Sequence, residues 1–409
     1  AAEYRENITV ASLAVGVGDV VTTRNRLEAC DPGIRGWEWR YLVGRTGTSL
    51  RVLDDGDAIV YTARFSPDGT RVATGYRADR YEARIWDAAT GRLVATLPAP
   101  GGSNTVAFSP DGDRALVCGL GSAVVWNIAD QRRVLTLPVI DSGSCDGAFS
   151  PDGERILTWQ WARPPQVWDA RTGDLIVTLP LEMNGERAKH GLGEAAFSAD
   201  GTRVITAHFN HVRIWDAATG ELQRTLTCES EQARDIEVST DGRSIIGFGF
   251  NNAVTVWDAT TGEVRATLTL KGDVGGVDAA FSPDGAFVVT SGYHRGVQVW
   301  NAATGALVRD FPVDHPEGWH SARISPDNAW VVVWGVGTPT VFAVATGERL
   351  RNLVGHADEV LEAQFSPDGS ILLTASQDGS ARLWETCSER NPKLLQAQRE
   401  PVLNLQFSN

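Results

Sequence analysis

Phe365-Ser366-Pro367-Asp368-Gly369 ends one strand-like run and opens a tight turn, and near-copies of this pentapeptide recur along the chain. The first residues of the eight copies lie 41 to 48 residues apart. About twenty residues after each copy comes an aromatic residue, which is tryptophan in every repeat but one. A period of roughly 40–45 residues with this tryptophan is typical of a β-propeller, in which each repeat forms a four-stranded blade. The anchors, each the first residue of a copy, are Phe65, Phe108, Phe149, Phe197, Val238, Phe281, Ile324 and Phe365.

The last repeat illustrates how one unit is expected to fold. Residues 360–365 form a first strand (a), and the Pro-Asp-Gly turn returns the chain into a second strand (b) at 371–376. Proline suits this turn because its φ is fixed near −65°. Residues 380–385 form a third strand (c), and a fourth (d) follows a glycine-ended turn, as at Asp87 to Gly91 in the first repeat. Eight copies of strands b and c predict an all-β, eight-bladed propeller; a seven-bladed ring is the alternative.

The two ends of the repeat array offer two ways to close the ring. Residues 48–53 read as an unpaired strand d ahead of the first blade, whereas residues 393–396 and 402–407 read as a further d and the start of a further a. Closure joins the ends of the array and removes exposed sheet edges. We favour closure by the N-terminal strand.

A Trp-Asp pair ends the expected third strand in four repeats: Trp86-Asp87, Trp168-Asp169, Trp215-Asp216 and Trp257-Asp258. With the Ser-Pro-Asp-Gly turn, this pair makes residues 48–409 resemble the WD-repeat (WD40) family of propellers. In that family a histidine, a strand-b hydroxyl, a turn aspartate and the tryptophan form a hydrogen-bonded tetrad. The resemblance implies a tetrad in the last repeat alone, as a structural feature, made of His356, Ser376, Asp378 and Trp384.

The first 47 residues follow a different period. Apolar residues fall at helical spacing from Tyr4 to Val15, and glycines at 16–18 and 31–33 separate three expected short helices. The phrase Arg-Gly-Trp-Glu-Trp-Arg-Tyr-Leu at 35–42 resembles the helical preface found before WD-repeat arrays in multidomain bacterial proteins, including Ser/Thr kinases. The resemblance implies that residues 1–47 connect the propeller to an effector domain. The alternative is a plug that packs Trp37 and Trp39 against the propeller.

The composition excludes several kinds of function. The chain of 409 residues has a formal net charge of −14, and no run of Lys or Arg forms the basic stripe that binds a phosphate backbone, so nucleic acid is not an expected partner. No stretch approaches the ~20 apolar residues of a membrane helix. Catalytic motifs such as Gly-x-Ser-x-Gly or a phosphate loop are missing, so we expect neither an enzyme nor a cofactor. His208 and His211 come nearest to a zinc pair, but no third ligand is apparent, and no metal is expected.

The two faces of the expected ring differ in how much their connections vary. Because consecutive strands alternate in direction, the d–a and b–c connections share one face, here called the top face, and the a–b and c–d turns share the bottom face. The bottom turns are nearly uniform in sequence. Five of the eight b–c turns carry an aromatic residue where turns ordinarily favour polar ones. Aligned on Gln377, the matching positions are Tyr76, Leu120, Trp161, Phe209, Phe250, Tyr293 and Val336.

The start of strand a is the second expected contributor to the top face. In the resembled family both places take part in partner binding, and aromatic residues with an occasional arginine dominate the binding energy of protein interfaces. The residues at or near the start of strand a are Tyr61, Arg234, Trp319, His320, Glu359 and Leu361. From the two sets, the expected partner-binding residues are Tyr76, Trp161, Phe209, Phe250, Tyr293, Arg234, Trp319, His320, Glu359 and Leu361.

These features predict a non-catalytic scaffold or sensor module of a bacterial multidomain protein, which binds a protein or peptide through the top face. One alternative is a small-molecule sensor, for a carbohydrate for example, at the mouth of the propeller channel. Another is that the rings fold inward between neighbouring blades and serve packing.

Overall fold

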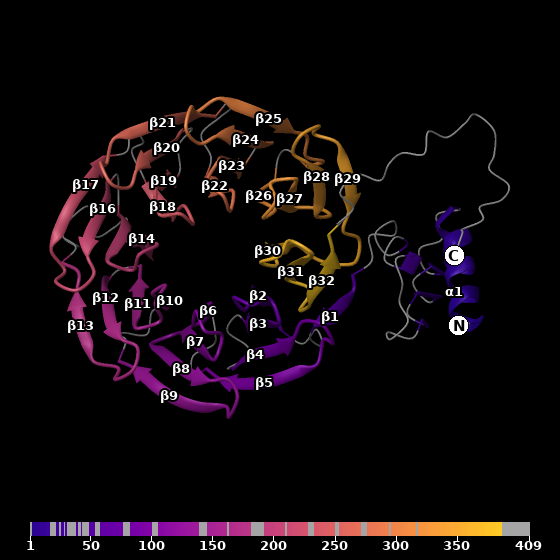
Figure 1. Cartoon of the computed structure of the whole chain (residues 1–409), viewed down its shortest axis with the longest axis horizontal. Helices are drawn as coiled ribbons and strands as arrows, with labels where there is room; N and C mark the ends of the chain where they lie inside the picture. The colour runs from indigo at the N-terminus through magenta and orange to yellow at the C-terminus, as the bar shows by residue number, and fades with distance from the viewer. Residues whose placement is uncertain are drawn as a thin grey trace, which may run out of the picture.

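Thirty-two strands and one helix make up the regular structure of the part of the chain that the computed structural model describes (Figure 1). Eight four-stranded antiparallel sheets stand around a central channel, so the predicted eight-bladed propeller is confirmed. The described residues are 2–16, 22–23, 26–27, 29–30, 38–39, 42, 49–53, 58–76, 82–99, 105–138, 145–161, 163–180, 192–208, 211–227, 233–249, 253–270, 276–293, 296–315 and 318–386.

Strands a and b form the inner half of every blade. Strand a borders the channel and ends at the anchor residue of the repeat. In blades 1 to 8, strand a is β2 (Val60–Phe65), β6 (Thr105–Phe108), β10 (Cys145–Phe149), β14 (Leu192–Phe197), β18 (Ala233–Val238), β22 (Val277–Phe281), β26 (His320–Ile324) and β30 (Val360–Phe365). Strand b is β3 (Arg71–Tyr76), β7 (Arg114–Gly119), β11 (Arg155–Gln160), β15 (Arg203–His208), β19 (Ser244–Gly249), β23 (Phe287–Gly292), β27 (Trp330–Gly335) and β31 (Ile371–Ser376).

Strands c and d form the outer half. Strand c ends at the repeated Trp-Asp position, and strand d runs along the circumference of the ring. In blades 1 to 8, strand c is β4 (Glu82–Asp87), β8 (Ser122–Asn127), β12 (Arg163–Asp169), β16 (His211–Asp216), β20 (Ala253–Asp258), β24 (Val297–Asn301), β28 (Thr340–Ala343) and β32 (Ala381–Glu385). Strand d is β5 (Leu93–Pro98), β9 (Arg132–Leu137), β13 (Leu175–Thr178), β17 (Leu222–Thr227), β21 (Val264–Thr269), β25 (Leu307–Phe311), β29 (Arg349–Asn352) and, in blade 8, β1 (Arg51–Leu53).

The N-terminal strand closes the ring, as the sequence predicted. β1 pairs antiparallel with β32, and Arg51 lies opposite Leu383. Blade 8 thus takes its outer strand from the start of the propeller and its three inner strands from the end, which ties the two ends of the array together. Residues 393–396 and 402–407, the alternative closing strands, lie outside the described residues.

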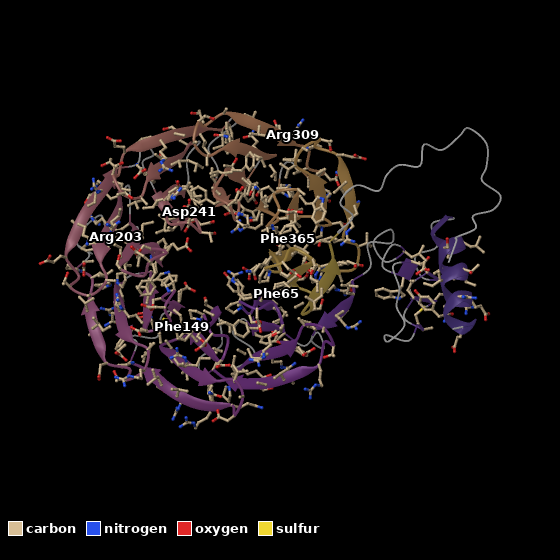
Figure 2. All side chains as sticks on the ribbon, in the orientation of Figure 1. Phe65, Phe149, Arg203, Asp241, Arg309 and Phe365 are labelled. Atoms are coloured by element: carbon tan, nitrogen blue, oxygen red, sulfur yellow. The ribbon has the colours of Figure 1, made fainter. Side chains whose placement is uncertain are left out.

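The apolar core is divided among the interfaces between neighbouring blades. Each interface has its own cluster of buried aliphatic side chains with the strand-c aromatic ring at one side, as with Trp86 between blades 8 and 1 and Trp300 between blades 5 and 6. Figure 2 shows these side chains filling the space between the sheets of the ring. Stacked sheets bury apolar area on both faces, so each blade depends on its two neighbours.

The bottom a–b turns are closed by their own polar side chains. In blade 1, the Ser66 hydroxyl donates to Asp68 Oδ1 (2.6 Å) and accepts from the Arg71 N–H (2.9 Å), while the Thr70 N–H donates to the same aspartate oxygen (3.0 Å). The hydrogen bond from Ser66 holds the pKa of Asp68 below its usual range. The serine-to-aspartate hydrogen bond recurs in all seven other turns, from Ser109, Ser150, Ser198, Ser239, Ser282, Ser325 and Ser366.

The N-terminal helix α1 (Ala2–Gly16) lies outside the ring, on the side where β1 and β29 are (Figure 1). Ala11 on this helix packs with Leu27, Trp39 and Leu42, and the indole N–H of Trp39 donates to the Leu27 carbonyl (2.8 Å). Trp39 therefore packs mainly within the N-terminal segment, where its indole nitrogen is satisfied. Trp37 lies outside the described residues, and the division into segments 1–47 and 48–409 stays a prediction.

Candidate functional site: the top face of the propeller

Within the described residues, four b–c turns place an apolar side chain on the top surface. Leu120, Trp161, Tyr293 and Val336 each follow the last residue of a strand b, and between 42% and 47% of each residue is exposed to solvent. Strand b is buried on both faces between the neighbouring blades, so a side chain becomes exposed only where the chain leaves the strand at the top of the ring. Trp161 and Tyr293 were expected partner-binding residues, and both are exposed; Leu120 and Val336 occupy the aligned positions but were not in the expected set.

Tyr293, Trp319 and Val336 form one continuous patch, here called the blade 6–7 patch. The rings of Tyr293 and Trp319 are tilted by 52° with centroids 6.2 Å apart, an arrangement within the range of favourable aromatic pairs. The Val336 N–H donates to the Trp319 carbonyl (3.2 Å). Gly318 permits this contact, because a Cβ there would lie 2.8 Å from the Val336 side chain. Two residues that the sequence suggested separately, Tyr293 and Trp319, are thus brought together.

Bulges at the start of strand a expose further side chains. In β2 the register shifts between Val60 and Thr62, and in β30 between Val360 and Glu362, so Tyr61 and Leu361 are the extra residues. A bulge re-aims the side chain of the unpaired residue. Tyr61 is consequently exposed, while Leu361 is half-buried. The backbone of Arg234 occupies the same kind of bulge in β18.

Tyr76 corrects one prediction, because it is fully buried. It lies opposite Val60, just as Ser376 lies opposite Val360, so Tyr76 is the last residue of strand b and not the first residue of the turn. A slip of one residue in a strand moves a side chain to the other face. The Tyr76 hydroxyl instead contacts the Thr74 hydroxyl (2.9 Å) in the blade interior.

His320 also corrects the prediction, since only 3% of it is exposed. Its Nε2 contacts the carbonyl of His315 (2.7 Å), so the ring fixes the preceding d–a connection. Glu359 is half-buried and accepts a hydrogen bond from the Gln377 amide (2.9 Å), which ties strand a to the b–c turn of blade 8. Phe209, Phe250 and the side chain of Arg234 lie outside the described residues.

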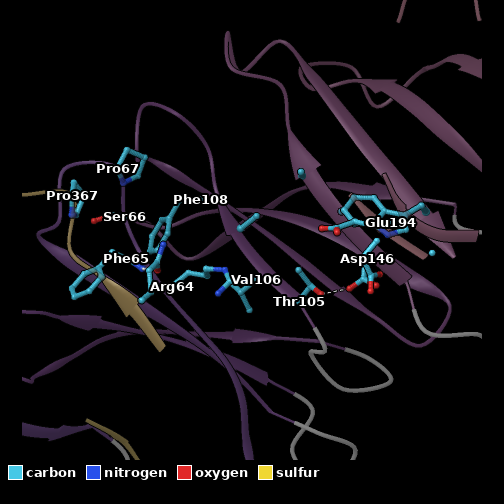
Figure 3. A pocket seen from close by; sticks show the side chains of 17 residues that line it. Arg64, Phe65, Ser66, Pro67, Thr105, Val106, Phe108, Asp146, Glu194 and Pro367 are labelled. Carbon is cyan, nitrogen blue, oxygen red and sulfur yellow. Dashed lines mark hydrogen bonds between the residues drawn. The ribbon is translucent and has the colours of Figure 1, made fainter. Parts of the chain in front are cut away.

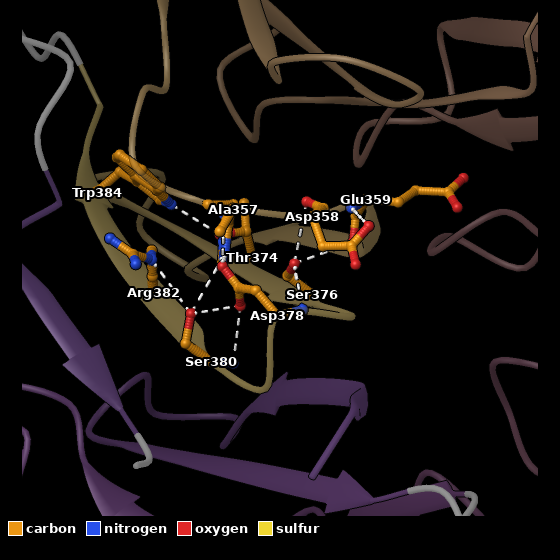
Figure 4. A network of polar contacts seen from close by, with 10 residues as sticks. Ala357, Asp358, Glu359, Thr374, Ser376, Asp378, Ser380, Arg382 and Trp384 are labelled. Carbon is orange, nitrogen blue, oxygen red and sulfur yellow. Dashed lines mark hydrogen bonds and ion pairs between the residues drawn. The ribbon is translucent and has the colours of Figure 1, made fainter. Parts of the chain in front are cut away.

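The hydrogen-bonded tetrad of blade 8 is present, but one of its four residues differs from the prediction. Trp384 Nε1 donates to Thr374 Oγ1 (2.8 Å), His356 Nε2 contacts the same hydroxyl (2.6 Å), and His356 Nδ1 contacts Asp378 Oδ2 (2.9 Å) (Figure 4). The hydrogen bonds form a chain with a single direction of donation: the Trp384 N–H donates to Thr374, the Thr374 hydroxyl donates to His356, and the His356 N–H donates to Asp378. The strand-b hydroxyl is Thr374 and not the expected Ser376.

Ser376 has a different role because it lies two residues further along the strand. Its hydroxyl donates to the Glu359 carbonyl (3.0 Å) and accepts from the Asp378 N–H (3.1 Å), so it holds the b–c turn against the start of strand a. The tryptophan-to-threonine bond of the tetrad recurs in blades 1, 3, 4 and 6, at Trp86, Trp168, Trp215 and Trp300.

The titrating groups of the tetrad have shifted pKa values. Burial lowers the pKa of His356, against the pull of Asp378 in the opposite direction. Burial opposes ionisation of Asp378, but hydrogen bonds from the Ser380 hydroxyl and the Ala357 N–H, with the charge of His356, outweigh it and lower the pKa to about 2. Asp378 is therefore a permanent acceptor for a neutral His356 at neutral pH, as a structural lock requires.

The channel contains a large hollow with a polar wall. This cavity of about 690 Å³ is bordered by strand-a residues of blades 1 to 5 and 8, and Figure 3 shows Arg64 on one side of it and Asp146 and Glu194 on the other. Its lining is strongly charged because the residues one and three places before each anchor alternate with the buried ones. The six carboxylates at these positions are Asp146, Glu194, Asp235, Glu237, Asp278 and Glu362, and the two cations are Arg64 and Arg323.

Both arginines have acidic partners. Arg64 forms an ion pair with Glu362, and Arg323 NH1 lies 3.3 Å from Asp278 Oδ2. The carboxylate of Glu362 also accepts the Ala63 N–H of the neighbouring blade (3.0 Å), and Glu237 does the same for the Phe281 N–H (3.1 Å). These side chains cap the free edges of the innermost strands. This charged layer was not predicted from the sequence, although its fixed offset from the anchors would have revealed it.

His208 and His211 lie opposite each other across the β15–β16 hairpin, and His208 is buried. Within the described residues, no group of three or more His, Cys, Asp or Glu side chains could hold a metal ion. In that same part of the chain, no helix is long and apolar enough to cross a membrane.

Comparisons with known proteins agree with this architecture. The sequence model of the family described as "WD domain, G-beta repeat" matches residues 47–87, 91–127, 264–301 and 347–385. A crystal structure of the computationally designed Ika8 protein resembles the chain with a TM-score of 0.69 at 21% identity, over 83% of this chain and 99% of the designed one. This likeness concerns the fold alone.

Among curated proteins, the chain is similar to Transducin beta-like protein 3 of Rattus norvegicus, with 25% identity over 56% of this chain and 29% of the relative. It is also similar to Eukaryotic translation initiation factor 3 subunit I of Lodderomyces elongisporus, with 28% identity over 47% of this chain and 46% of the relative. The chain thus matches less than half the length of either relative. Both are eukaryotic, so a bacterial multidomain origin stays a prediction. The matches and the fold together show that the chain carries WD40 repeats within an eight-bladed propeller.

Proposed function

We propose that this propeller is a non-catalytic interaction module that binds a protein or peptide through its top face. The observation that carries the proposal is the exposure of Leu120, Trp161, Tyr293 and Val336 at equivalent turns of one face. Exposed apolar side chains that gather on one surface mark interaction sites, and aromatic residues dominate the binding energy of such sites.

The opposite face supports the same assignment by contrast. Each bottom a–b turn uses its serine and aspartate to satisfy its own backbone, so these groups are already engaged in internal hydrogen bonds. The relatives add support of a general kind. One of the two relatives is named as a subunit of a translation initiation factor, so its name describes a component of a larger assembly.

A connector role of the N-terminal segment is part of the proposal. Helix α1 exposes Leu13, while Ala11 on the same helix is buried in the N-terminal cluster. An exposed apolar position on a helix beside the ring suits contact with an effector domain in a longer protein, as the resemblance of residues 35–42 implies.

The test compares two matched double variants as baits in a lysate of the native host. Trp161→Ala with Tyr293→Ala removes two exposed top-face rings. Leu175→Ala with Leu222→Ala removes two side chains of similar exposure, 47% and 49%, from strands d on the circumference. We expect the intact chain and the circumference variant to retain the same proteins, and the top-face variant to lose them with an unchanged melting temperature. Equal retention by both variants would contradict the proposal.

A small-molecule sensor, for a carbohydrate for example, is the second candidate. The channel cavity of about 690 Å³ favours it, because ligand sites commonly enclose 300–1,000 Å³. A thermal-shift screen of monosaccharides and oligosaccharides separates the two, since a ligand that binds only the folded state raises the melting temperature. A shift that disappears in Asp146→Asn would assign the ligand to the channel.

A further inference from the structure

Several acidic side chains and one aromatic side chain lie together in one part of the channel wall. Asp146 lies opposite Trp159 in the β10–β11 pair, and both line the cavity together with Glu194 and Asp235 of the next two blades. Gly147, Ala148 and Gly193 also border this part of the cavity, so its other lining residues here are small. An indole beside carboxylates is a combination that binds guanidinium and ammonium groups.

The channel has more acids than the two arginines can neutralise. Arg64 and Arg323 are paired with Glu362 and Asp278, and both of these pairs are formed from blades 1, 6, 7 and 8. The side that blades 3 to 5 form carries carboxylates at four of the six acidic positions and no arginine at any of these channel positions. Acidic groups gathered in a hollow attract a cation more strongly than the same groups on a flat surface.

These carboxylates lie in the middle part of strand a. Asp146 is the second residue of β10 and Glu194 the third of β14, so each lies roughly 3–7 Å below the first residue of its strand at the rise of a β-strand. The cavity also extends to the bottom turns, where Ser66, Pro67 and Pro367 border it. Trp161 follows β11 of the same blade 3 and is exposed on that face. An aromatic rim residue and an acidic wall therefore belong to the same sector of the ring.

We propose that a partner segment lying across the top face inserts an arginine or lysine side chain into the channel, between Trp159 and the carboxylates of Asp146, Glu194 and Asp235. This inference rests on the proposed function and adds the chemistry of the partner: a basic, extended segment whose apolar residues contact the rim. The net charge of −14 favours the approach of such a segment.

The protonation of the acidic side chains of the channel predicts a pH dependence of binding. Burial, followed by the charges of Asp235 and Glu237, raises the pKa of Glu194 to about 8, while burial raises the pKa of Glu237 to about 7 and also raises that of Asp146. In the free protein Glu194 holds a proton near neutral pH, and Glu237 holds one for part of the time. A bound cation favours the ionised form, so binding releases protons, and affinity rises as pH increases from about 6 to 9. The charged groups near Glu194 are Asp146 on β10, Asp235 and Glu237 on β18, Arg323 on β26 and Arg64 on β2.

The probe is a set of randomised octapeptide pools that differ only at one fixed position: arginine, lysine, citrulline or glutamate. Citrulline keeps the shape of arginine without its charge, and the pools average over sequence context. The immobilised intact chain is expected to enrich the arginine and lysine pools at least tenfold over the citrulline pool. The enrichment is expected to increase from pH 6 to pH 9.

Matched variants locate the effect. Glu194→Gln with Asp146→Asn removes two charges whose ionisation burial already disfavours, so folding is expected to persist, and enrichment is expected to fall below twofold. Asp174→Asn with Glu263→Gln makes the same charge change on the exposed outside and is expected to leave enrichment intact. Equal binding of the arginine and citrulline pools, binding of no pool, or enrichment that survives the channel variant would each overturn the inference.

The same experiment separates this inference from the function on which it rests. Pools that bind without regard to charge and are lost with Trp161→Ala and Tyr293→Ala would keep the top-face function and remove the cation site. Arginine-specific binding that is indifferent to those two substitutions would keep the cation site and remove the top-face function.

Discussion

The bottom turns and the top connections come from the same eight repeats, yet they treat their side chains differently. At the bottom, the Ser66 and Asp68 side chains bond to each other and to the backbone of their own turn. At the top, Trp161 and Tyr293 extend into solvent with nearly half of each residue exposed. The bottom turns thus have nearly the same sequence in every repeat and hydrogen-bond within themselves. The top turns vary in sequence and expose apolar side chains. This contrast distinguishes residues that hold the ring from residues available to a partner.

The largest expected loss of stability comes from a substitution that disrupts a bottom turn. Gly153 has φ +71°, and a Cβ there would lie 3.3 Å from Cδ of Pro110 in the neighbouring blade. Gly153→Val forces a β-branched residue into the left-handed region, and we expect a loss of about 2 kcal/mol in the free energy of unfolding. Chemical denaturation measures it.

A control for that variant exists in the chain itself. Asn328 occupies the equivalent turn position in blade 7 with φ 59°. Gly153→Asn should therefore cost clearly less than Gly153→Val, since asparagine tolerates this conformation. Neither variant should weaken partner binding by the folded protein. Weakened binding would show that the bottom face takes part in it.

The next effect concerns the tetrad that joins top and interior in blade 8. Thr374→Val removes the hydroxyl between His356 and Trp384 while keeping the shape of the side chain. Two buried nitrogens lose their partner, and we expect a cost of about 1.5 kcal/mol in denaturation experiments. Thr374→Ser keeps the hydroxyl and should recover most of the loss. If Thr374→Val is as stable as the intact chain, the tetrad is not a structural lock.

A smaller effect of opposite sign is expected in blade 2. There Val117 occupies the position of the tetrad threonine, and the buried Trp126 Nε1 has no hydrogen-bond partner within the described residues. Val117→Thr supplies an acceptor at the place where Thr74, Thr158 and Thr206 supply one in other blades. We expect a gain of about 1 kcal/mol. A loss of stability would mean that the geometry of blade 2 does not permit the bond.

The last expected effect is a pH dependence of stability. The pKa of Glu194 is about 8 in the folded chain, against an ordinary value of 4.5, so between these values the folded state holds more protons than the unfolded state. Stability therefore falls as pH rises through this range. The melting temperature should be lower at pH 8.5 than at pH 6.5, and Glu194→Gln should reduce the difference. A difference that is unchanged in the variant would place its origin elsewhere.

The repeated part of the fold was predictable, because the sequence of each repeat contains the residues that form its turns. The anchors and the eight blades follow from the period and the count of strands, and the favoured closure by an N-terminal strand at 48–53 is confirmed by the pairing of residues 51–53. Bulges and the exact ends of strands were less accessible. Tyr76 was assigned to the turn because the sequence does not mark the last residue of strand b, and a one-residue slip was enough to exchange surface for core.

The channel was missed for a different reason. Asp146, Glu194 and Asp235 come from three separate blades, and only the closed ring brings them to one cavity. Each residue taken alone reads as a polar position in a short strand, and the common offset from the anchors becomes visible only when the eight repeats are aligned. The exchange of Ser376 for Thr374 in the tetrad has a similar cause, because either hydroxyl satisfies the sequence pattern and only their side-chain directions distinguish them.

Site-specific photo-cross-linking tests the central contrast between the two faces most directly. A photoreactive residue is placed in turn at Leu120 on the top face, at Leu222 on the circumference and at exposed Thr202 in a bottom turn, and each protein is irradiated with its bound partner. The account predicts a covalent adduct from position 120 and none from positions 222 and 202. An adduct from position 202, or equal adducts from all three, would contradict the assignment of binding to the top face.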